Sequence, residues 1–190
     1  IFDCLVGSEM CIRDSVIETI SPHKDVDGLH PMNVGNLSSG YQGSIPCTPL
    51  GCYYLLKKIE PNLTGKKAVM IGRSNLNGKA MAQLLLQEDC TVTITHSKTK
   101  DLQHECLEAD VIVAAVGIPE LIKGNWVKKD AIVIDVGINK TENGLVGDVD
   151  FEEVSKVAKA LTPVPGGVGP MTIACLLKNT IECFKRTLNN

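Results

Sequence analysis

Between residues 67 and 136, short apolar runs alternate with amphipathic stretches in the manner of repeated β-α units. The runs predict four strands, over residues 67–71, 91–95, 111–116 and 131–136. The last two runs are almost continuously apolar, and such strands alternating with helices indicate a parallel sheet covered on both faces. The pattern therefore predicts an α/β fold with a Rossmann-like doubly wound parallel sheet, which binds ligands at the carboxyl ends of its strands.

Apolar residues at helical spacing mark the segments around these strands. Three helices are predicted over residues 78–87, 102–107 and 152–159. Thr48 as N-cap and Pro49 as first helical residue predict another helix, which ends at Pro61. A last helix is predicted from Pro170 to about Leu188, with an apolar stripe along one side. The stripe consists of Ile173, Leu177, Ile181 and Phe184.

Turn-forming residues predict the connections. Residues 24–35 read as a polar loop after a helix end at 16–20, and Asn143-Gly144 fits a hairpin turn between short strands. Three prolines and three glycines between Pro163 and Pro170 predict a rigid loop with close backbone approach. Residues 1–15 have no sustained period and resemble translated sequencing-adapter read-through. We interpret them as a foreign segment, the alternative being an irregular natural N-terminus.

A polar loop from Gly72 to Asn77 follows the first predicted strand, and Gly78 opens the next helix. Backbone N–H groups at a helix start carry the positive end of the helix dipole, so phosphate is the expected ligand. The spacing differs from the usual G-x-G-x-x-G motif, and an ordinary strand-to-helix turn is the alternative interpretation.

The second predicted strand ends in His96-Ser97-Lys98, where NAD-binding domains usually carry an acidic residue. The Ser97 hydroxyl and the cations of Arg73 and Lys98 suit a 2′-phosphate, which a carboxylate would repel. The sequence therefore predicts NADP as the cofactor. The alternative is that Arg73 and Lys98 are simply solvated.

The composition excludes several classes of function. The 190 residues are 44% hydrophobic and 22% charged, which suits one full domain and part of another. The net charge of −3 without a basic run predicts neither a nucleic acid nor a membrane as partner. Eight cysteines without a C-x-x-C pair or zinc spacing predict reduced core thiols in a reducing compartment, with disulfides as the alternative. Asp25 and Asp27 lack a third ligand, so they are predicted to bond local backbone and no metal is expected.

Five motifs follow one another along the chain. They are KDVDG at 24–28, GRSN at 72–75 with GK at 78–79, HSKT at 96–99, VIDVGIN at 133–139 and TPVPGGVGPMT at 162–172. From about Val16 to Phe184 the chain resembles bifunctional methylenetetrahydrofolate dehydrogenase/methenyltetrahydrofolate cyclohydrolase. The resemblance implies one-carbon folate metabolism: NADP-dependent oxidation of 5,10-methylenetetrahydrofolate to 5,10-methenyltetrahydrofolate, and hydrolysis of that product to 10-formyltetrahydrofolate.

The same resemblance implies roles for particular residues. The residues that would contact NADP are Gly72, Arg73, Ser74, Ser97 and Ile138. Asp27 would hold the pterin of the tetrahydrofolate substrate by a charge-assisted hydrogen bond. The folate cleft would be walled by Pro165, Gly166, Gly167, Val168 and Gly169. Further implications are a homodimer in the intact enzyme, a cytoplasmic location and a part in purine biosynthesis.

Members of the family carry a first lobe whose Tyr-x-x-x-Lys motif acts in water addition and in orienting folate. Tyr53-x-x-x-Lys57 lies outside the matching segment, so we assign it no catalytic role and predict no catalytic residue. The chain is interpreted as N-terminally truncated. Residues 47–162 are then the NADP-binding domain, and residues 16–46 and 163–190 are the remnant of an α/β folate-binding catalytic lobe. Loss of the lobe is expected to leave the apolar stripe of the last helix exposed and to favour aggregation.

Two other functions are considered beside the family enzyme. One is an NADP-binding module without turnover, because the chain lacks the lysine that would activate water. A Rossmann dehydrogenase for a small hydroxy acid lacks support, since no His or Lys is placed as its acid/base. Hydride transfer depends mainly on proximity, whereas water addition needs a base, so any residual activity is predicted to be dehydrogenase.

Overall fold

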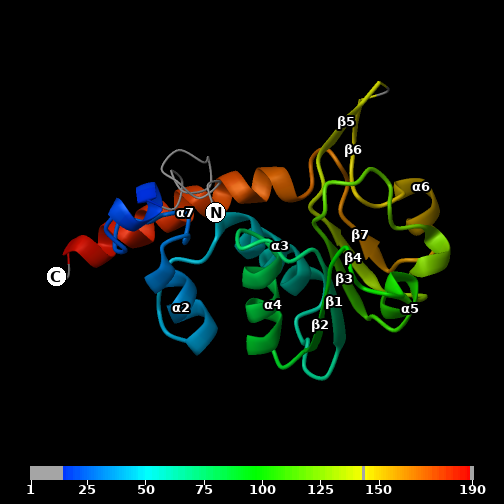
Figure 1. The fold of residues 1–190 in the computed structure, drawn as a ribbon, viewed down its shortest axis with the longest axis horizontal. Coiled ribbons are helices and arrows are strands. Elements are labelled where there is room, and N and C mark those ends of the chain that lie inside the picture. The colour runs from blue at the N-terminus through cyan, green and yellow to red at the C-terminus, as the bar shows by residue number, and fades with distance from the viewer. Residues whose placement is uncertain (1–14, 143, 189–190) are drawn as a thin grey trace, which may run out of the picture.

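The computed structural model describes residues 15–142 and 144–188, and its centre is a parallel five-stranded sheet (Figure 1). The strand order is β2-β1-β3-β4-β7. The strands are β1 (Lys67–Ile71), β2 (Thr91–Thr95), β3 (Val111–Ala114), β4 (Ile132–Asp135) and β7 (Ala160–Leu161). The order reverses between β1 and β3, which is the point where open α/β sheets bind ligands. The predicted doubly wound parallel sheet is confirmed.

Helices cover both faces of this sheet (Figure 1). One face carries α3 (Cys47–Ile59) and α4 (Gly78–Gln87). The other carries α5 (Leu102–Leu107), the 3-10 turn η1 (Gly124–Trp126) and α6 (Phe151–Val154). Along β3, Val111 and Val113 pack on the first face and Ile112 on the second. Burial on both faces explains why β3 is apolar at every position.

Three further elements lie outside the sheet layers. β5 (Asn139–Thr141) and β6 (Gly144–Val146) pair antiparallel as a projecting hairpin (Figure 1). α2 (Pro31–Ser39) packs against α4, and a helical turn at 15–19 precedes it. α7 (Val168–Leu188) packs along α3 and extends past the sheet (Figure 1). Asn143 of the predicted hairpin turn and residues 1–14 lie outside the described residues.

The bounds of β1, β2, α4 and α5 agree with the sequence predictions. The strands predicted over 111–116 and 131–136 are shorter, since β3 ends at Ala114 and β4 spans Ile132–Asp135. The helix predicted over 152–159 is a single turn, α6. These differences concern element ends and leave the topology unchanged.

Two predictions around the first long helices are wrong. Residues from Pro31 onward form α2 and not a loop, because His30 Nδ1 accepts a hydrogen bond from Met32 N (3.1 Å) and Pro31 stands in the first turn. α3 begins at Cys47, so Thr48 is not its N-cap. The Thr48 hydroxyl instead shares a hydrogen bond with Thr172 Oγ1 of α7 (3.1 Å).

α7 begins at Val168, two residues before the predicted start at Pro170. Pro170 fits there because the first N–H groups of a helix have no intrahelical partner. The side of α7 against α3 carries Cys175 and the more distal Asn179 and Cys183, all buried. The apolar stripe points away and is 54–64% exposed at Ile173, Leu177, Ile181 and Phe184. The predicted exposure is confirmed, and aggregation through this stripe stays a prediction.

Candidate cofactor and substrate site

The connection from β1 to α4 turns so tightly that two of its positions admit only glycine. Gly72 has φ +111°, and a Cβ there would lie 2.4 Å from the carbonyl oxygen of Ala115. A Cβ on Gly78 would lie 2.2 Å from the carbonyl oxygen of Gly72. The loop is therefore drawn against both the end of β3 and the start of α4. A backbone without side chains at these points can approach a phosphate group closely.

Ser74 caps the start of α4 from inside this loop. Its Oγ accepts hydrogen bonds from the N–H groups of Asn77 (3.2 Å) and Gly78 (3.4 Å), and its carbonyl accepts from Lys79 N (3.1 Å). These three amides are thus satisfied by Ser74 within the loop. The helix dipole still directs its positive end at Ser74, so the hydroxyl marks the position that favours an anion.

The connection after β2 presents Ser97 and Lys98 at the tip of a fixed turn. His96 N donates to Thr99 Oγ1 (2.9 Å), and Lys98 N donates to His96 Nδ1 (3.1 Å). Both tip side chains are exposed, as is Arg73 in the neighbouring loop. Because β1 and β2 are parallel and in register, Arg73 and Ser97 lie beyond the same edge of the sheet. The next carboxylate along the chain, Asp101, is engaged in capping α5.

Ile138 stands beyond the end of β4 on this same edge and is 65% exposed. The order of the strands places the predicted cofactor residues in a row, from Ser97 through Gly72–Ser74 to Ile138, with the end of β3 between the last two. A row of loops at the carboxyl ends of parallel strands is where a doubly wound sheet binds a dinucleotide. The structure thus brings together all five predicted cofactor residues.

Sequence reasoning missed two buried carboxylates under this row, Asp135 and Asp148. They hold the ends of β3 and β4 through backbone hydrogen bonds, for example from Val116 N to Asp148 Oδ2 (2.6 Å) and from Gly137 N to Asp135 Oδ1 (2.9 Å). The sequence does carry a signal for this buried pair: Asp135 comes directly after the apolar run of β4, and Asp148 comes directly after Gly147. A charge at such positions is seldom buried without donors.

Asp27, the predicted pterin ligand, is exposed on a loop that is fixed from several sides. Cys47 Sγ donates to Asp27 Oδ1 (3.5 Å). Burial and the Asp27 carboxylate raise the pKa of the Cys47 thiol to about 12, so it keeps its proton. Gly28 has φ +68°, and a Cβ there would lie 2.7 Å from backbone atoms of residues 44–46. One oxygen of the Asp27 carboxylate is thereby held, on a residue that is otherwise exposed.

The buried amide of Asn179 joins α7 to this loop. Its Nδ2 donates to the carbonyl oxygens of Val26 and Ile45, each at 2.8 Å. Asp25 supports the loop from within, accepting from His30 N and from the side chain of Asn33 at 2.8 Å each. The prediction that the aspartates of this loop bond local backbone is confirmed for Asp25. No group of three His, Cys, Asp or Glu side chains among the described residues could hold a metal ion.

The Pro165–Gly169 segment follows β7 and runs into the first residues of α7. Gly166 has φ +99°, and a Cβ on Gly167 would lie 2.4 Å from the carbonyl oxygen of Pro163. Val168 is buried and belongs to the core under α3, so its backbone and not its side chain can face a ligand. Asn179 follows Val168 by eleven residues, or about 16 Å of helix. α7 therefore carries this segment at its start and fixes the Asp27 loop three turns later.

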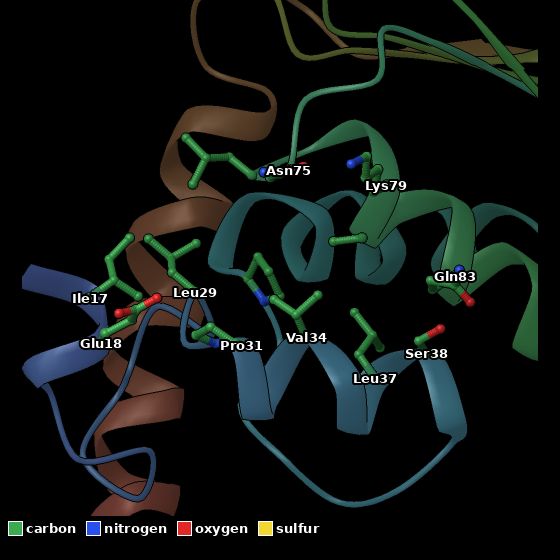
Figure 2. A pocket seen from close by; sticks show the side chains of 13 residues that line it. Ile17, Glu18, Leu29, Pro31, Val34, Leu37, Ser38, Asn75, Lys79 and Gln83 are labelled. Carbon is green, nitrogen blue, oxygen red and sulfur yellow. The ribbon is translucent and has the colours of Figure 1, made fainter. Parts of the chain in front are cut away.

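A pocket of about 490 Å³ lies between α2 and α4 (Figure 2). Val34 and Leu37 of α2 face Lys79 and Gln83 of α4 across it (Figure 2). Asn75 and Leu76, in the connection from β1 to α4, also line it. Neither Asp27 nor the Pro165–Gly169 segment lines this pocket, so it is not the folate cleft that the resemblance implies.

Tyr53 and Lys57 both bind the carboxylate of Glu88, at the end of α4. This engagement supports leaving the pair without a catalytic role. The predicted free thiols are confirmed for Cys47, Cys52, Cys90, Cys106, Cys175 and Cys183, all buried. The helices in the described part of the chain include none that is long and apolar enough to cross a membrane.

The sheet order, the tight glycine loop after β1 and the row of loops beyond the strands define a dinucleotide-binding domain of the Rossmann type. A family model described as "Tetrahydrofolate dehydrogenase/cyclohydrolase, NAD(P)-binding domain" matches residues 46–188. The chain belongs to this family of tetrahydrofolate dehydrogenases/cyclohydrolases, as the five sequence motifs indicate.

Similar proteins agree with this assignment. The bifunctional protein FolD of Pelagibacter ubique is 85% identical over 175 residues, which are 92% of this chain and 62% of that protein. The solved bifunctional enzyme FolD of Campylobacter jejuni superimposes with a TM-score of 0.90 at 53% identity, over 92% of this chain and 63% of that one. FolD of Trypanosoma brucei, solved with NADP and an inhibitor, has a TM-score of 0.87 at 40% identity, with coverage of 94% and 64%. The chain thus spans about three fifths of the length of these relatives.

Proposed function

We propose that the chain belongs to an enzyme that oxidises 5,10-methylenetetrahydrofolate with NADP and hydrolyses the resulting 5,10-methenyltetrahydrofolate to 10-formyltetrahydrofolate. The observation that carries the proposal is the row of Ser97, Gly72–Ser74 and Ile138 along one edge of the sheet. Membership of the dehydrogenase/cyclohydrolase family and the NADP bound to the Trypanosoma brucei relative support it.

The described residues fit NADP, which when bound supplies a nicotinamide ring that accepts a hydride. The space that a Cβ at Gly72 or Gly78 would fill lets the backbone approach the phosphates. Arg73 and Ser97 would bind the 2′-phosphate, and their exposure on two adjacent loops supports this role. Ser74 contacts the cofactor at the start of α4, and Ile138 contacts it from the end of β4.

Asp27 and the Pro165–Gly169 segment are the proposed folate contacts. The Asp27 carboxylate accepts a hydrogen bond from an N–H group of the pterin, and Cys47 holds its other oxygen. The rigid segment orients the methylene bridge for hydride loss. In the oxidation the bridging carbon loses a hydride and becomes the methenyl cation. In the hydrolysis water adds to that carbon with loss of a proton, and one carbon–nitrogen bond breaks to give the 10-formyl group.

An assay of both reactions with the purified chain tests the proposal. We expect any turnover to be the NADP-dependent oxidation, because alignment of two carbon centres drives it, whereas water addition needs a base. NADPH formation and loss of methenyltetrahydrofolate would be followed by absorbance. Hydrolysis of methenyltetrahydrofolate above the uncatalysed rate, without any oxidation, would contradict this expectation.

A second candidate function is an NADP-binding module without turnover. The engagement of Tyr53 and Lys57 with Glu88 favours it, since this pair then supplies no base for water. Tight NADP binding with no rate in either assay would support this function over the enzyme.

Selection of NADP over NAD is expected to depend on Arg73. Replacing Arg73 by alanine removes a charge-assisted bond to the 2′-phosphate, worth about 1.5–3 kcal/mol, so NADP affinity should fall by roughly tenfold to a hundredfold. The affinity for NAD, which lacks that phosphate, should stay the same. Titration calorimetry with both cofactors measures the two dissociation constants. Lys58→Ala on α3 is the control for net charge. Equal loss of NAD and NADP affinity in Arg73→Ala would argue against this role.

The proposal extends to the setting of the intact enzyme. The family resemblance supports a homodimer that acts in the cytoplasm and supplies 10-formyltetrahydrofolate to purine biosynthesis. The net charge of −3 and the absence of a basic run in the sequence support a small-molecule role without nucleic acid or membrane partners.

A further inference from the structure

Two buried carboxylates lie under the cofactor row, and the proposed chemistry does not use them. Asp135 is 3% exposed and Asp148 is fully buried. The chain makes room for them with glycines, since a Cβ on Gly147 would lie 1.8 Å from Asp135 Oδ2 and one on Gly137 would lie 2.2 Å from Asp148 Oδ1. Such close fitting shows that these loops are built around the two carboxyl groups.

Asp148 ties the end of β3 to the end of β4. Its Oδ2 accepts hydrogen bonds from Val116 N (2.6 Å) and Gly117 N (3.0 Å). Its Oδ1 accepts from the side-chain amide of Asn139 (2.9 Å), next to Ile138. One carboxylate therefore sets the separation of two neighbouring strand-end loops.

Asp135 in turn holds Asp148. Its Oδ1 accepts from Gly137 N and from Asp148 N, both at 2.9 Å, and its Oδ2 accepts from Val149 N at 3.0 Å. Hydrogen bonds to an ionised carboxylate are the stronger kind, so the network is firmest when Asp135 carries its charge.

We propose that Asp148 and Asp135 are positioning residues for the cofactor, which hold the Val116–Gly117 and Gly137–Asn139 loops where NADP contacts them. The proposal rests on the proposed NADP function. The geometry links the network to the site at two points, since Val116 Cγ1 would lie 3.4 Å from a Cβ on Gly72 and Ile138 stands within the second loop.

The network predicts a pH dependence of binding. Burial raises the pKa of the Asp135 carboxyl to about 6, and the Asp148 carboxylate acts in the same direction, while backbone N–H donors from Asp148, Val149 and Gly137 oppose the shift. Among the described residues around it, Asp148 is the charged group that faces Asp135. If NADP binds best to the ordered loops, it favours the ionised form and lowers the pKa of Asp135. Affinity should then fall by about tenfold between pH 7 and pH 5.

A pH titration of the unmodified chain by NMR tests this directly. The amide signals of Gly137, Asp148 and Val149 should shift with a midpoint near 6, and saturating NADP should move that midpoint downward. A midpoint that NADP leaves in place overturns the inference while NADP binding itself stands. A chain that binds no NADP at any pH overturns the cofactor assignment and the inference with it.

Variants supply a second test. Asp148→Asn should weaken NADP binding about tenfold or more, because its single acceptor oxygen cannot serve both the backbone N–H groups of Val116 and Gly117 and the side-chain amide of Asn139, and its charge is lost. Asp110→Asn is the matched control, since Asp110 also accepts a backbone N–H bond, from Lys67 N (2.9 Å), but precedes β3 at the opposite edge of the sheet. Unchanged affinity in a folded Asp148→Asn chain overturns the proposal. If this variant does not fold, the NMR titration decides.

The Asp135→Asn variant distinguishes titration of the Asp135 carboxyl from titration of the cofactor in the pH dependence of NADP binding. The cofactor phosphate also titrates near pH 6, but its effect is common to both proteins and cancels in the ratio of their dissociation constants. The dissociation constant of the variant for NADP, divided by that of the wild type, should fall toward pH 5. Only the wild type has an Asp135 carboxylate that loses its charge there. A constant ratio from pH 5 to pH 8 overturns the role of Asp135.

Discussion

Replacement of Gly78 by alanine is expected to weaken NADP binding by more than tenfold and to destabilise the domain by about 1–3 kcal/mol. The added Cβ would lie 2.2 Å from Gly72 O and 2.8 Å from the Cα of Arg73, so backbone and not a flexible side chain has to move. That movement displaces Arg73 and opens the turn that Ser74 caps. Titration calorimetry with NADP and thermal unfolding would measure the two effects.

Gly35→Ala is the matched control. Gly35 also lies in a helix, α2, and a Cβ there would meet no atom of the described chain within 4 Å beyond its own helix backbone. Alanine in a helix interior is favoured over glycine by up to about 1 kcal/mol, so this variant should be slightly more stable and bind NADP normally. A Gly78→Ala chain with the NADP affinity of the Gly35→Ala chain would contradict the close approach at Gly72.

Removal of the Asn179 side-chain amide is expected to destabilise the chain by about 2–4 kcal/mol. Asn179→Ala leaves the carbonyl oxygens of Val26 and Ile45 without the donor that joins them to α7. It also opens a small cavity beside Cys47, which otherwise receives a weak bond from the same amide. Denaturant unfolding gives the loss of free energy.

Hydrogen exchange locates the effect. The amides of the Asp25–Gly28 loop should exchange faster in Asn179→Ala. The amides of β3 should keep the same ranking of protection against exchange as in the wild type. Lys178→Ala, at an exposed position one residue earlier, should change stability by less than about 0.5 kcal/mol. Uniformly faster exchange, with no preference for the Asp27 loop, would show that Asn179 supports α7 generally and not the loop.

The parallel sheet could be predicted because local pattern decides its first four strands, whereas the short β7 was missed. An apolar run gave β1 its observed bounds, a β-branched run gave β2 its bounds, and helical spacing gave α4. α2 was missed because few of its residues are buried, and its start depends on a His30 side-chain cap that resembles an ordinary polar loop in sequence. α3 begins at Cys47 with Pro46 as its N-cap and no side-chain cap, so the cap signal of Thr48 was misleading, and its hydroxyl is engaged with α7 instead.

The cofactor row could be predicted for a similar reason, since the carboxyl ends of parallel strands share one edge. The buried side chains that hold this row and the Asp27 loop in place could not be predicted. Asp148 and Asp135 stand thirteen residues apart and meet only because two loops fold over each other. Asn179 reaches Val26 across 153 residues of sequence. Contacts of this range leave no periodic signal, so a buried polar side chain is known only once its donors and acceptors are in view.

The position of α7 has a consequence for biosynthesis. Val168 completes the core beneath α3, Cys175 packs against Cys47 and Leu50, and Asn179 secures the Asp27 loop, yet all three are translated after the whole sheet. A ribosome-bound chain can pair its strands as they emerge, because β1 to β7 precede α7. The segment bearing Asp27 is synthesised well before α7, and its contacts with Asn179 cannot form until α7 has been made. During that interval it is open to chaperones and proteases, and this part of the molecule matures only once α7 has been synthesised.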